Sequence, residues 1–265
     1  MEDFNEIIKK GICIPIIPES GGDSREVHTL IHNNNKYILR KCGSQKTRDK
    51  YLETYKKFQK FDFLPRLLYI HGNNLLFEYI QGRDLLKTDA ELTASKIGMI
   101  TAITNSFQGD IDININNKFY KAINYLFNQK IINDNQKNKA VKIFENNKPK
   151  KIEIITEIKD LAHHNFRIGR EIFLVDIDAI QPHLKGIGIA KAFLKWFRKP
   201  KERELFLQGY NEINDSSFWT PKYQKFAYLI YLILKLEKWH KLSTRKEDFQ
   251  KHLNWFHLLL DNQLK

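Results

Sequence analysis

Three polar residues in the second half of the sequence have the types and the spacing that phosphoryl transfer requires. Asp160 is followed five positions later by Asn165, and the four-residue apolar run 172–175 ends at Asp176. In phosphoryl transfer one carboxylate orients the attacking hydroxyl, while an asparagine oxygen and a second carboxylate hold Mg²⁺, which holds the phosphates. The spacing therefore predicts Asp160 as the catalytic carboxylate and Asn165 and Asp176 as metal ligands.

The elements around these residues are expected to bring them to one point. The run 172–175 predicts a buried strand whose end presents Asp176 and, two residues later, Asp178. Because side chains alternate along a strand, the two acids share a face if the extended geometry continues. We expect Asp178 to bind a second metal ion or to cap the following turn. The alternative is that all these residues are turn residues beside a core strand.

The bulk properties describe an ordinary globular protein. The chain has 265 residues, of which 42% are hydrophobic and 28% charged, and this length predicts one large domain or two lobes. Cys13 and Cys42 match no metal spacing and no disulfide framework, which favours a reducing compartment. The first residues lack the basic region of a signal peptide, and the longest apolar run, 226–234, is too short to span a bilayer. We therefore expect a cytoplasmic protein.

The net charge of +13 is compatible with nucleic acid, an anionic membrane face or a phosphorylated small molecule such as ATP. Lysines are scattered over most of the chain, which argues against a dedicated nucleic-acid stripe. One local cluster surrounds Trp196 and Phe197, and it predicts peripheral contact with anionic lipid at the inner membrane face. Its cations are Lys195, Arg198, Lys199, Lys201 and Arg203. The alternative is a solvated loop with Trp196 in the core.

The N-terminal part of the chain predicts two β-hairpins. The first joins segments 27–31 and 36–41 through an Asn-rich turn, and the second joins 63–70 and 74–80. Gly21 and Gly22 lie just before the first strand, where glycines let backbone N–H groups approach phosphate oxygens. The alternative for this pair is an ordinary tight turn.

Charged residues on the first hairpin and on the next helix form a candidate phosphate grip. Arg40 and Lys41 end the second strand and face opposite ways. A cation at this position grips the α- and β-phosphates in kinases. The helix expected over 45–61 carries Asp49 and Glu53 on one face, and we expect one of them to pair with Arg40, with Glu53 preferred for its reach.

The second hairpin ends at a candidate hinge. Glu78 and Tyr79 lead to Gly82, and their backbone groups are free to meet an adenine edge. Beyond the hinge, apolar periodicity predicts a mainly helical region. The expected helices are 90–107, 119–127, 140–144, 186–197, 201–210, 222–239 and 248–260.

Taken in order, these parts resemble the aminoglycoside phosphotransferase and choline kinase branch of the protein-kinase-like superfamily. The resemblance implies a two-lobed α+β fold, with a small antiparallel-sheet N-lobe over 1–82 and a mainly helical C-lobe over 83–265. It also implies ATP and Mg²⁺ as cofactors and matches Asp160, Asn165 and Asp176 to the family's catalytic and metal-binding positions. The residues matched to nucleotide binding are Gly21, Gly22, Ser24, Arg40, Glu53, Glu78 and Tyr79.

The chain departs from the family pattern at three positions, one of which is Lys159, between Ile158 and Asp160. Ile158 stands where the family usually has a histidine two residues before the catalytic aspartate, and Arg40 stands where it has a lysine. An arginine still binds phosphate, but the two residues are not interchangeable. Segment 191–210 is also similar in style to bacterial lipopolysaccharide core sugar kinases, which act at the cytoplasmic membrane face.

These patterns predict an ATP-dependent phosphotransferase that moves the γ-phosphoryl group to a hydroxyl of a small molecule, a sugar or sugar-containing lipid. One alternative is a catalytically impaired kinase-like binding protein. Another is a protein Ser/Thr kinase, which is disfavoured because no Ala-Pro-Glu segment follows Asp176. The sequence leaves the acceptor and the oligomeric state open.

Overall fold

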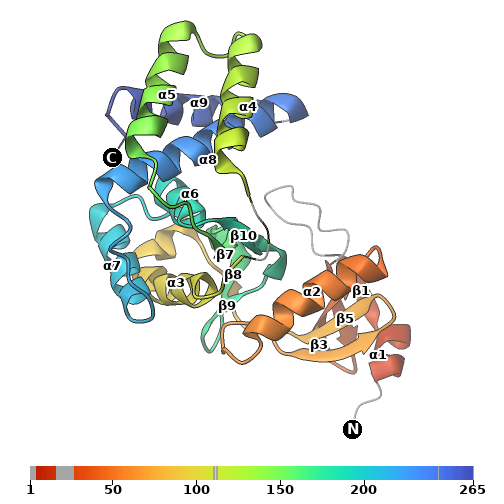
Figure 1. Ribbon diagram of the computed structural model, residues 1–265. Helices are drawn as coiled ribbons and strands as arrows, with labels where there is room; N and C mark the ends of the chain where they lie inside the picture. Colours follow the sequence, from red (N-terminus) through yellow and green to blue (C-terminus); the bar gives the residue numbers. More distant parts are fainter. Residues whose placement is uncertain (1–3, 16–26, 110, 112, 244, 265) are drawn as a thin grey trace. The chain divides into compact units, whose positions relative to one another are not determined.

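The computed structural model describes the chain except for residues 1–3, 16–26, 110, 112, 244 and 265 (Figure 1). The chain divides into two compact units. Unit 1 comprises Met1–Leu86 and His163–Asp178, and unit 2 comprises Lys87–Ala162 and Ala179–Lys265. The lobe boundary at residue 82 stays a prediction.

Unit 1 contains the predicted small antiparallel sheet, with strand order β1-β2-β3-β5-β4. Both predicted hairpins are present. The β2–β3 turn places Asn33 and Asn34 at φ 48° and 64°, a left-handed region that asparagine tolerates, and the β4–β5 turn has Gly72 at φ 54°. The strands are β1 Ile12–Pro15, β2 Val27–His32, β3 Asn35–Lys41, β4 Leu67–His71 and β5 Asn74–Glu78.

A helix packs on each face of this sheet. Helix α2, Gln45–Phe58, begins where the Ser44 hydroxyl accepts a hydrogen bond from the backbone N–H of Thr47, at 3.2 Å, and its buried tyrosines contact Phe77. Helix α1, Phe4–Lys10, contributes Ile7 to a cluster with residues of the opposite strand face, Leu39 among them.

A second sheet in unit 1 contains the predicted strand 172–175 in shorter form, because the strand ends at Leu174 and Val175 is 38% exposed. Its order is β6-β8-β9, with β6 Arg83–Asp84, β8 Phe166–Ile168 and β9 Ile172–Leu174, and the short helix η2, His163–Asn165, precedes β8. Gly82 has φ 141°, and a Cβ there would lie 1.8 Å from the Ile168 carbonyl oxygen. Only glycine allows the segment before β6 to pass so close to the β8–β9 turn.

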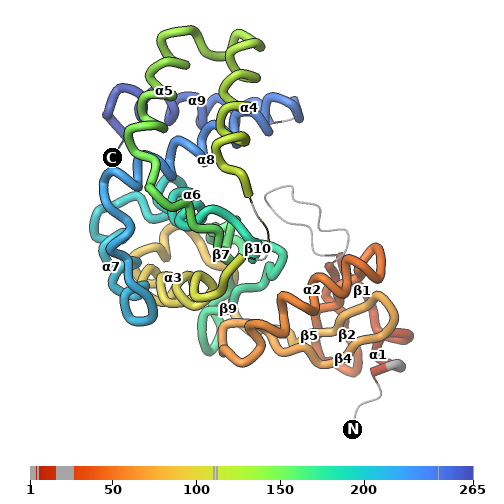
Figure 2. Tube along the Cα trace, in the orientation of Figure 1, coloured from red at the N-terminus to blue at the C-terminus, as the bar shows by residue number. Residues whose placement is uncertain are grey.

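Unit 2 is mainly helical, as predicted, and its described residues include an antiparallel strand pair, β7 Ile154–Ile158 and β10 Ile180–Leu184. Figure 2 shows helices α3 and α7 side by side. They approach closely because glycines face the partner backbone: a Cβ on Gly98 would lie 2.0 Å from the Phe206 oxygen, and one on Gly209 would lie 1.9 Å from the Ser95 oxygen. The helices of unit 2 are η1 Lys87–Asp89, α3 Ala90–Asn105, α4 Ile115–Asn128, α5 Asp134–Asn147, α6 Ile187–Lys195, α7 Pro200–Asn211, α8 Pro221–Leu242 and α9 Lys246–Leu260. The short helix η3, Ile177–Ala179, spans the boundary between the units.

The helices α4 and α5 are longer than the apolar pattern predicted. Asn114 and Asn133 cap their first turns by accepting hydrogen bonds from the backbone N–H groups of Asn117 and Gln136, each at 2.9 Å. The residues that follow each cap are mostly polar and show no apolar periodicity. The apolar pattern therefore begins several residues after the true start of each helix.

Of the two interpretations of the segment around Trp196 and Phe197, the structure supports the one that places Trp196 in the core. Trp196 and Phe197 are 3% and 0% exposed, and their rings stack 4.3 Å apart inside unit 2. The alternative with Trp196 in the core is therefore confirmed, because aromatic surface of this size is stabilised by burial. Within the described residues, no helix is long and apolar enough to cross a bilayer.

Candidate functional site

The two predicted metal ligands Asn165 and Asp176 lie at the same end of the β8–β9 hairpin. Phe166 pairs with Leu174 in the ladder, and the Val175 N–H donates to the Asn165 carbonyl oxygen at 2.9 Å. The pairing thus continues up to the residues that flank the hairpin's open end. The register of the two short strands therefore places Asn165 and Asp176 at the same end of the hairpin. Their role as metal ligands stays a prediction.

Asp176, Asp178 and Arg40 form a charged cluster in unit 1. Burial raises the pKa of Asp176, the charge of Asp178 raises it further, and Arg40 partly lowers it. Asp178 forms an ion pair with Arg40, whose guanidinium also lies 4.6 Å from the centre of the Tyr51 ring. Two carboxylates and one guanidinium leave the cluster with a net negative charge that an additional cation would neutralise.

This donor set fits Mg²⁺. The described residues contain no group of three or more His, Cys, Asp and Glu side chains able to hold a metal ion. Mg²⁺ prefers oxygen ligands and usually takes only one or two protein carboxylates, completing its shell with phosphate oxygens and water. Asp176 and Asp178 supply carboxylate oxygens of this kind. The amide oxygen of Asn165, at the same end of the hairpin, is a donor of a suitable type.

The predicted pairing of Arg40 with Glu53 or Asp49 is wrong. Arg40 pairs with Asp178, while Glu53 approaches Lys57 at 3.9 Å and Asp49 accepts from Arg48 at 2.8 Å. Helix α2 turns Tyr51, Tyr55 and Phe58 to the sheet, and residues two positions away point to solvent. The face of the helix that carries its acids is therefore the exposed one.

Asp160 lies in unit 2, in the turn after β7, where it forms an ion pair with Lys191 of α6. Lys191 is only 6% exposed. Burial lowers the pKa of the Lys191 ammonium well below its usual range. Sequence reasoning missed Lys191, although a single lysine inside the apolar run 187–194 was a usable signal, because a buried cation requires a partner.

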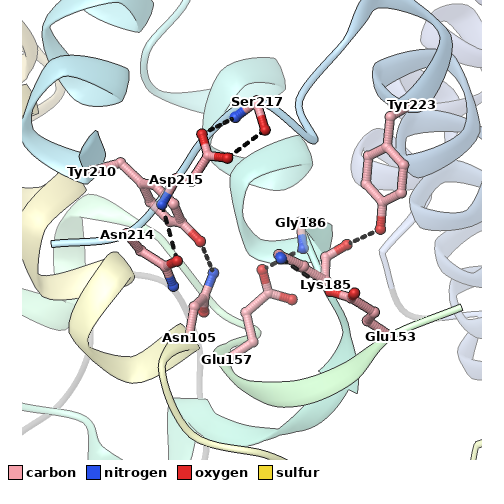
Figure 3. A network of polar contacts seen from close by, with 10 residues as sticks. All are labelled: Asn105, Glu153, Glu157, Lys185, Gly186, Tyr210, Asn214, Asp215, Ser217 and Tyr223. Atoms are coloured by element: carbon pink, nitrogen blue, oxygen red, sulfur yellow. Dashed lines mark hydrogen bonds and ion pairs between the residues drawn. The ribbon is translucent and has the colours of Figure 1, made fainter. Parts of the chain in front are cut away.

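A buried carboxylate, Glu157, fixes helix α6 to strand β7 (Figure 3). Its two oxygens accept hydrogen bonds from the backbone N–H groups of Gly186 and Ile187, at 2.9 and 3.1 Å. Burial raises the pKa of Glu157 to about 8, although these backbone donors partly lower it. A carboxyl group at a helix N-terminus satisfies N–H groups that have no partner inside the helix.

Glu157 directly precedes Ile158, the residue that stands where the family usually has a histidine. Ile158 is fully buried, and a Cβ on Gly188 would lie 2.3 Å from its carbonyl oxygen. The first turn of α6 thus packs directly on the end of β7, two residues before Asp160. Glu157, which sequence reasoning missed, supplies a buried hydrogen-bond anchor that Ile158 cannot.

The candidate hinge residues are held by their neighbours in unit 1. The Glu78 carboxylate accepts from the Arg66 N–H at 2.8 Å, and the Tyr79 ring lies 5.2 Å from the Arg167 guanidinium. Arg167 donates to the Tyr79 hydroxyl at 3.1 Å, to the Gly82 carbonyl oxygen at 2.7 Å and to the Asp84 carboxylate at 3.0 Å. Arg167, also missed, therefore ties strand β8 to the segment 79–84, and the role of this segment as a hinge stays a prediction. The predicted phosphate-covering residues Gly21, Gly22 and Ser24 lie outside the described residues.

Comparisons with solved structures show what this architecture is similar to. The choline kinase LicA from Streptococcus pneumoniae superposes with a TM-score of 0.70 at 14% sequence identity, over 98% of this chain and 99% of that chain. The chain has the fold of the choline kinases and aminoglycoside phosphotransferases. An aminoglycoside phosphotransferase from Alicyclobacillus acidocaldarius gives a TM-score of 0.67 at 10% identity, over 98% and 93% of the two chains. The amicoumacin kinase hAmiN, in complex with AMP-PNP, Ca²⁺ and Ami, gives 0.60 at 15% identity, over 99% and 94%.

The sequence alone is matched by no protein-family model and by no curated protein. The predicted fold is confirmed by the structural neighbours. The similarity to lipopolysaccharide kinases stays a prediction.

Proposed function

We propose that this protein is an ATP-dependent phosphotransferase that moves the γ-phosphoryl group of ATP to a hydroxyl of a small molecule. The observation that carries the proposal is the cluster at the open end of the β8–β9 hairpin, where Asn165 and Asp176 flank the strands and Asp178 pairs with Arg40. Structural neighbours that share the fold are kinases, and three of these structures hold AMP or AMP-PNP.

Each residue has a role that its chemistry supports. Asp160 orients the acceptor hydroxyl, and its ion pair with Lys191 restricts the orientation of the carboxylate. Asn165 and Asp176 hold Mg²⁺, which, when bound, neutralises charge on the phosphate oxygens. Asp178 either shares this ion or serves only to hold Arg40. Because the transition state of phosphoryl transfer is loose, positioning and charge neutralisation supply most of the catalysis.

The nucleotide contacts follow from the same proposal. Arg40 binds phosphate oxygens, and its guanidinium is held in place by Asp178 and the Tyr51 ring rather than by an acid on α2. The backbone at Glu78 and Tyr79 meets the adenine edge, and Gly21, Gly22 and Ser24 cover the phosphates. For the acceptor we propose a sugar or a sugar-containing lipid. Peripheral contact with anionic membrane would have to use cations alone, since Trp196 and Phe197 are buried.

A second candidate function is nucleotide binding without turnover. Two observations favour it: the Asp160 carboxylate is already paired with an ammonium, and Ile158 replaces the family's histidine. A carboxylate paired with a cation is a weaker hydrogen-bond acceptor for an incoming hydroxyl.

Two measurements separate these possibilities. Calorimetric titration with the non-hydrolysable analogue AMP-PNP, with and without Mg²⁺, tests nucleotide binding, which both candidates require. Transfer of ³²P from γ-labelled ATP to a pool of small hydroxyl compounds then tests catalysis, with Asp160→Asn as the matched variant. Mg²⁺-dependent binding without any Asp160-dependent transfer would favour the second candidate, and absence of binding would contradict both.

A further inference from the structure

A group of half-buried and exposed lysines surrounds Lys191, the partner of Asp160. We define the lysine cluster as Lys191 and Lys195 of α6 with Lys235 and Lys238 of α8. The two helices pack against each other in unit 2, and Asp160 pairs with Lys191 from the turn after β7. The cluster thus adjoins Asp160, the carboxylate that we propose orients the acceptor hydroxyl.

The positive charges of the cluster act on one another. Burial lowers the pKa of Lys235 to about 8, and the charges of Lys238, Lys195 and Lys159 lower it further. Burial also lowers the pKa of Lys191, and the charges of Lys235, Lys195 and Lys238 add to the effect. The charge of Lys159, which directly precedes Asp160 in the chain, thus also acts on the cluster.

Carboxylates do not balance these charges. Within the described part of the chain, no carboxylate forms an ion pair with Lys195, Lys235 or Lys238. Among the lysines of the cluster, Asp160 pairs with Lys191. The charge of Asp248 acts on both Lys191 and Lys195, where it partly offsets the effect of burial. Like charges that are partly removed from water destabilise a fold unless a partner compensates them.

Aromatic rings line the same region. The Lys235 ammonium lies 5.9 Å from the centre of the Tyr231 ring and 5.3 Å from that of Trp239, and Lys238 also lies 5.3 Å from Trp239. The Trp239 indole N–H is buried and has no hydrogen-bond acceptor among the described residues. The region therefore offers several ammonium donors and one unused indole donor, which together suit an anion.

The structural neighbours include choline and ethanolamine kinases, and choline carries a permanent positive charge. Recognition of such a cation requires carboxylates or open aromatic faces. In this chain, lysines already occupy the aromatic faces of Tyr231 and Trp239. A cationic acceptor would be repelled here.

We propose that the acceptor is an anionic hydroxyl compound, with a phosphate or carboxylate group near the hydroxyl to be phosphorylated, and that the lysine cluster binds this anionic group. The inference rests on the proposed phosphotransferase function and narrows its substrate class. The ammonium groups would position the acceptor by its charge, while Asp160 meets its hydroxyl.

The test fractionates a small-molecule extract by ion exchange into anionic, neutral and cationic pools and offers each pool to the full-length protein with Mg²⁺ and γ-³²P-labelled ATP. We expect label to enter the anionic pool. In Lys195→Met and Lys235→Met, the apparent KM for that pool should rise at least about tenfold per removed charge, with the KM for ATP unchanged. Lys225→Met is the matched control, since this exposed α8 lysine hydrogen-bonds Asn262 at 3.0 Å, away from the cluster.

Lys235→Arg keeps the charge and should retain most of the activity of the wild type. Thermal unfolding serves as a second readout, because removing one of several crowded cations should leave the unfolding temperature unchanged or higher. A purely structural role for Lys235 would instead lower it.

Labelling of only the neutral or cationic pool would overturn the inference while leaving the phosphotransferase function intact. The inference also fails if labelling of the anionic pool is insensitive to both lysine variants, or if they raise the KM for ATP instead. Label in no pool would contradict the proposed function itself, and the inference with it.

Discussion

Replacement of Asp176 by asparagine tests the assigned metal site most directly. Asp176 and Asp178 contribute two negative charges, and Arg40, paired with Asp178, contributes one positive charge. Asp176 therefore supplies the uncompensated negative charge of the cluster. The amide introduced by Asp176→Asn would nearly preserve the shape of the side chain and bring the net charge of the cluster to zero.

The expected loss follows from the charge removed. At about 4 Å and an effective dielectric constant of about 20, two unit charges interact by roughly 4 kcal/mol. Even half of this value lowers the affinity for a cation by more than about tenfold, and a divalent ion doubles the interaction. We expect turnover to fall at least about a hundredfold, with much of the loss recovered at high Mg²⁺ concentration.

Without bound metal, we expect Asp176→Asn to leave the stability of the fold unchanged or to increase it. Burial and the charge of Asp178 raise the pKa of Asp176, so the ionised form is disfavoured in the folded protein. A neutral amide removes this penalty, and the unfolding temperature of the metal-free variant should be unchanged or higher.

The assays are ³²P transfer across a series of Mg²⁺ concentrations and thermal unfolding with and without Mg²⁺ and ADP. Asp62→Asn, which removes an exposed carboxylate of the same unit, is the control and should change neither. The reasoning is refuted if Asp176→Asn keeps full activity. It is also refuted if activity falls without any change in the Mg²⁺ dependence while the metal-free protein loses several degrees of stability.

Three further predictions concern the supporting residues. Arg40→Ala should weaken ATP binding or turnover at least about tenfold. Lys41→Ala should change neither, because the two side chains leave opposite faces of β3. Sensitivity at Lys41 alone would mean that the strand register is shifted by one residue. Glu157 has a pKa raised to about 8 in the folded state, so its contribution to stability is fully present below about pH 4.5 and is lost as the pH rises through 8. The unfolding temperature of the wild type should therefore decline more steeply between about pH 5.5 and 8.5 than that of Glu157→Gln, and parallel pH profiles would contradict this assignment. Gly188→Ala places a Cβ 2.3 Å from the Ile158 carbonyl oxygen. The substitution should destabilise the protein by about 1–3 kcal/mol and, by displacing α6, reduce turnover. An unchanged unfolding temperature would show that α6 does not pack as described.

Much of the local structure was determined by the sequence itself. The Asn-rich turn specifies the β2–β3 hairpin, because asparagine tolerates the left-handed backbone at Asn33 and Asn34. The apolar run before Asp176 specifies strand β9, and the alternation along β3 places Arg40 and Leu39 on opposite faces. Turn chemistry and side-chain periodicity act over a few residues, so they can be read from a short stretch of chain. The spacing from Asp160 to Asp176 predicted a phosphoryl-transfer site for the same reason.

The partners of the charged groups were decided only by the tertiary structure. Arg40 pairs with Asp178, which is 138 positions away, and Asp160 pairs with Lys191 on a helix beyond the β8–β9 hairpin. Sequence reasoning chose Glu53 for Arg40 because it compared reach along the chain. Burial of the Tyr51 face of α2 then directed Glu53 to solvent. The free energy gained by burying the apolar face of a helix far exceeds the gain from one exposed ion pair, so burial fixes the rotation of the helix. The charged groups then pair with the groups that this packing brings near them.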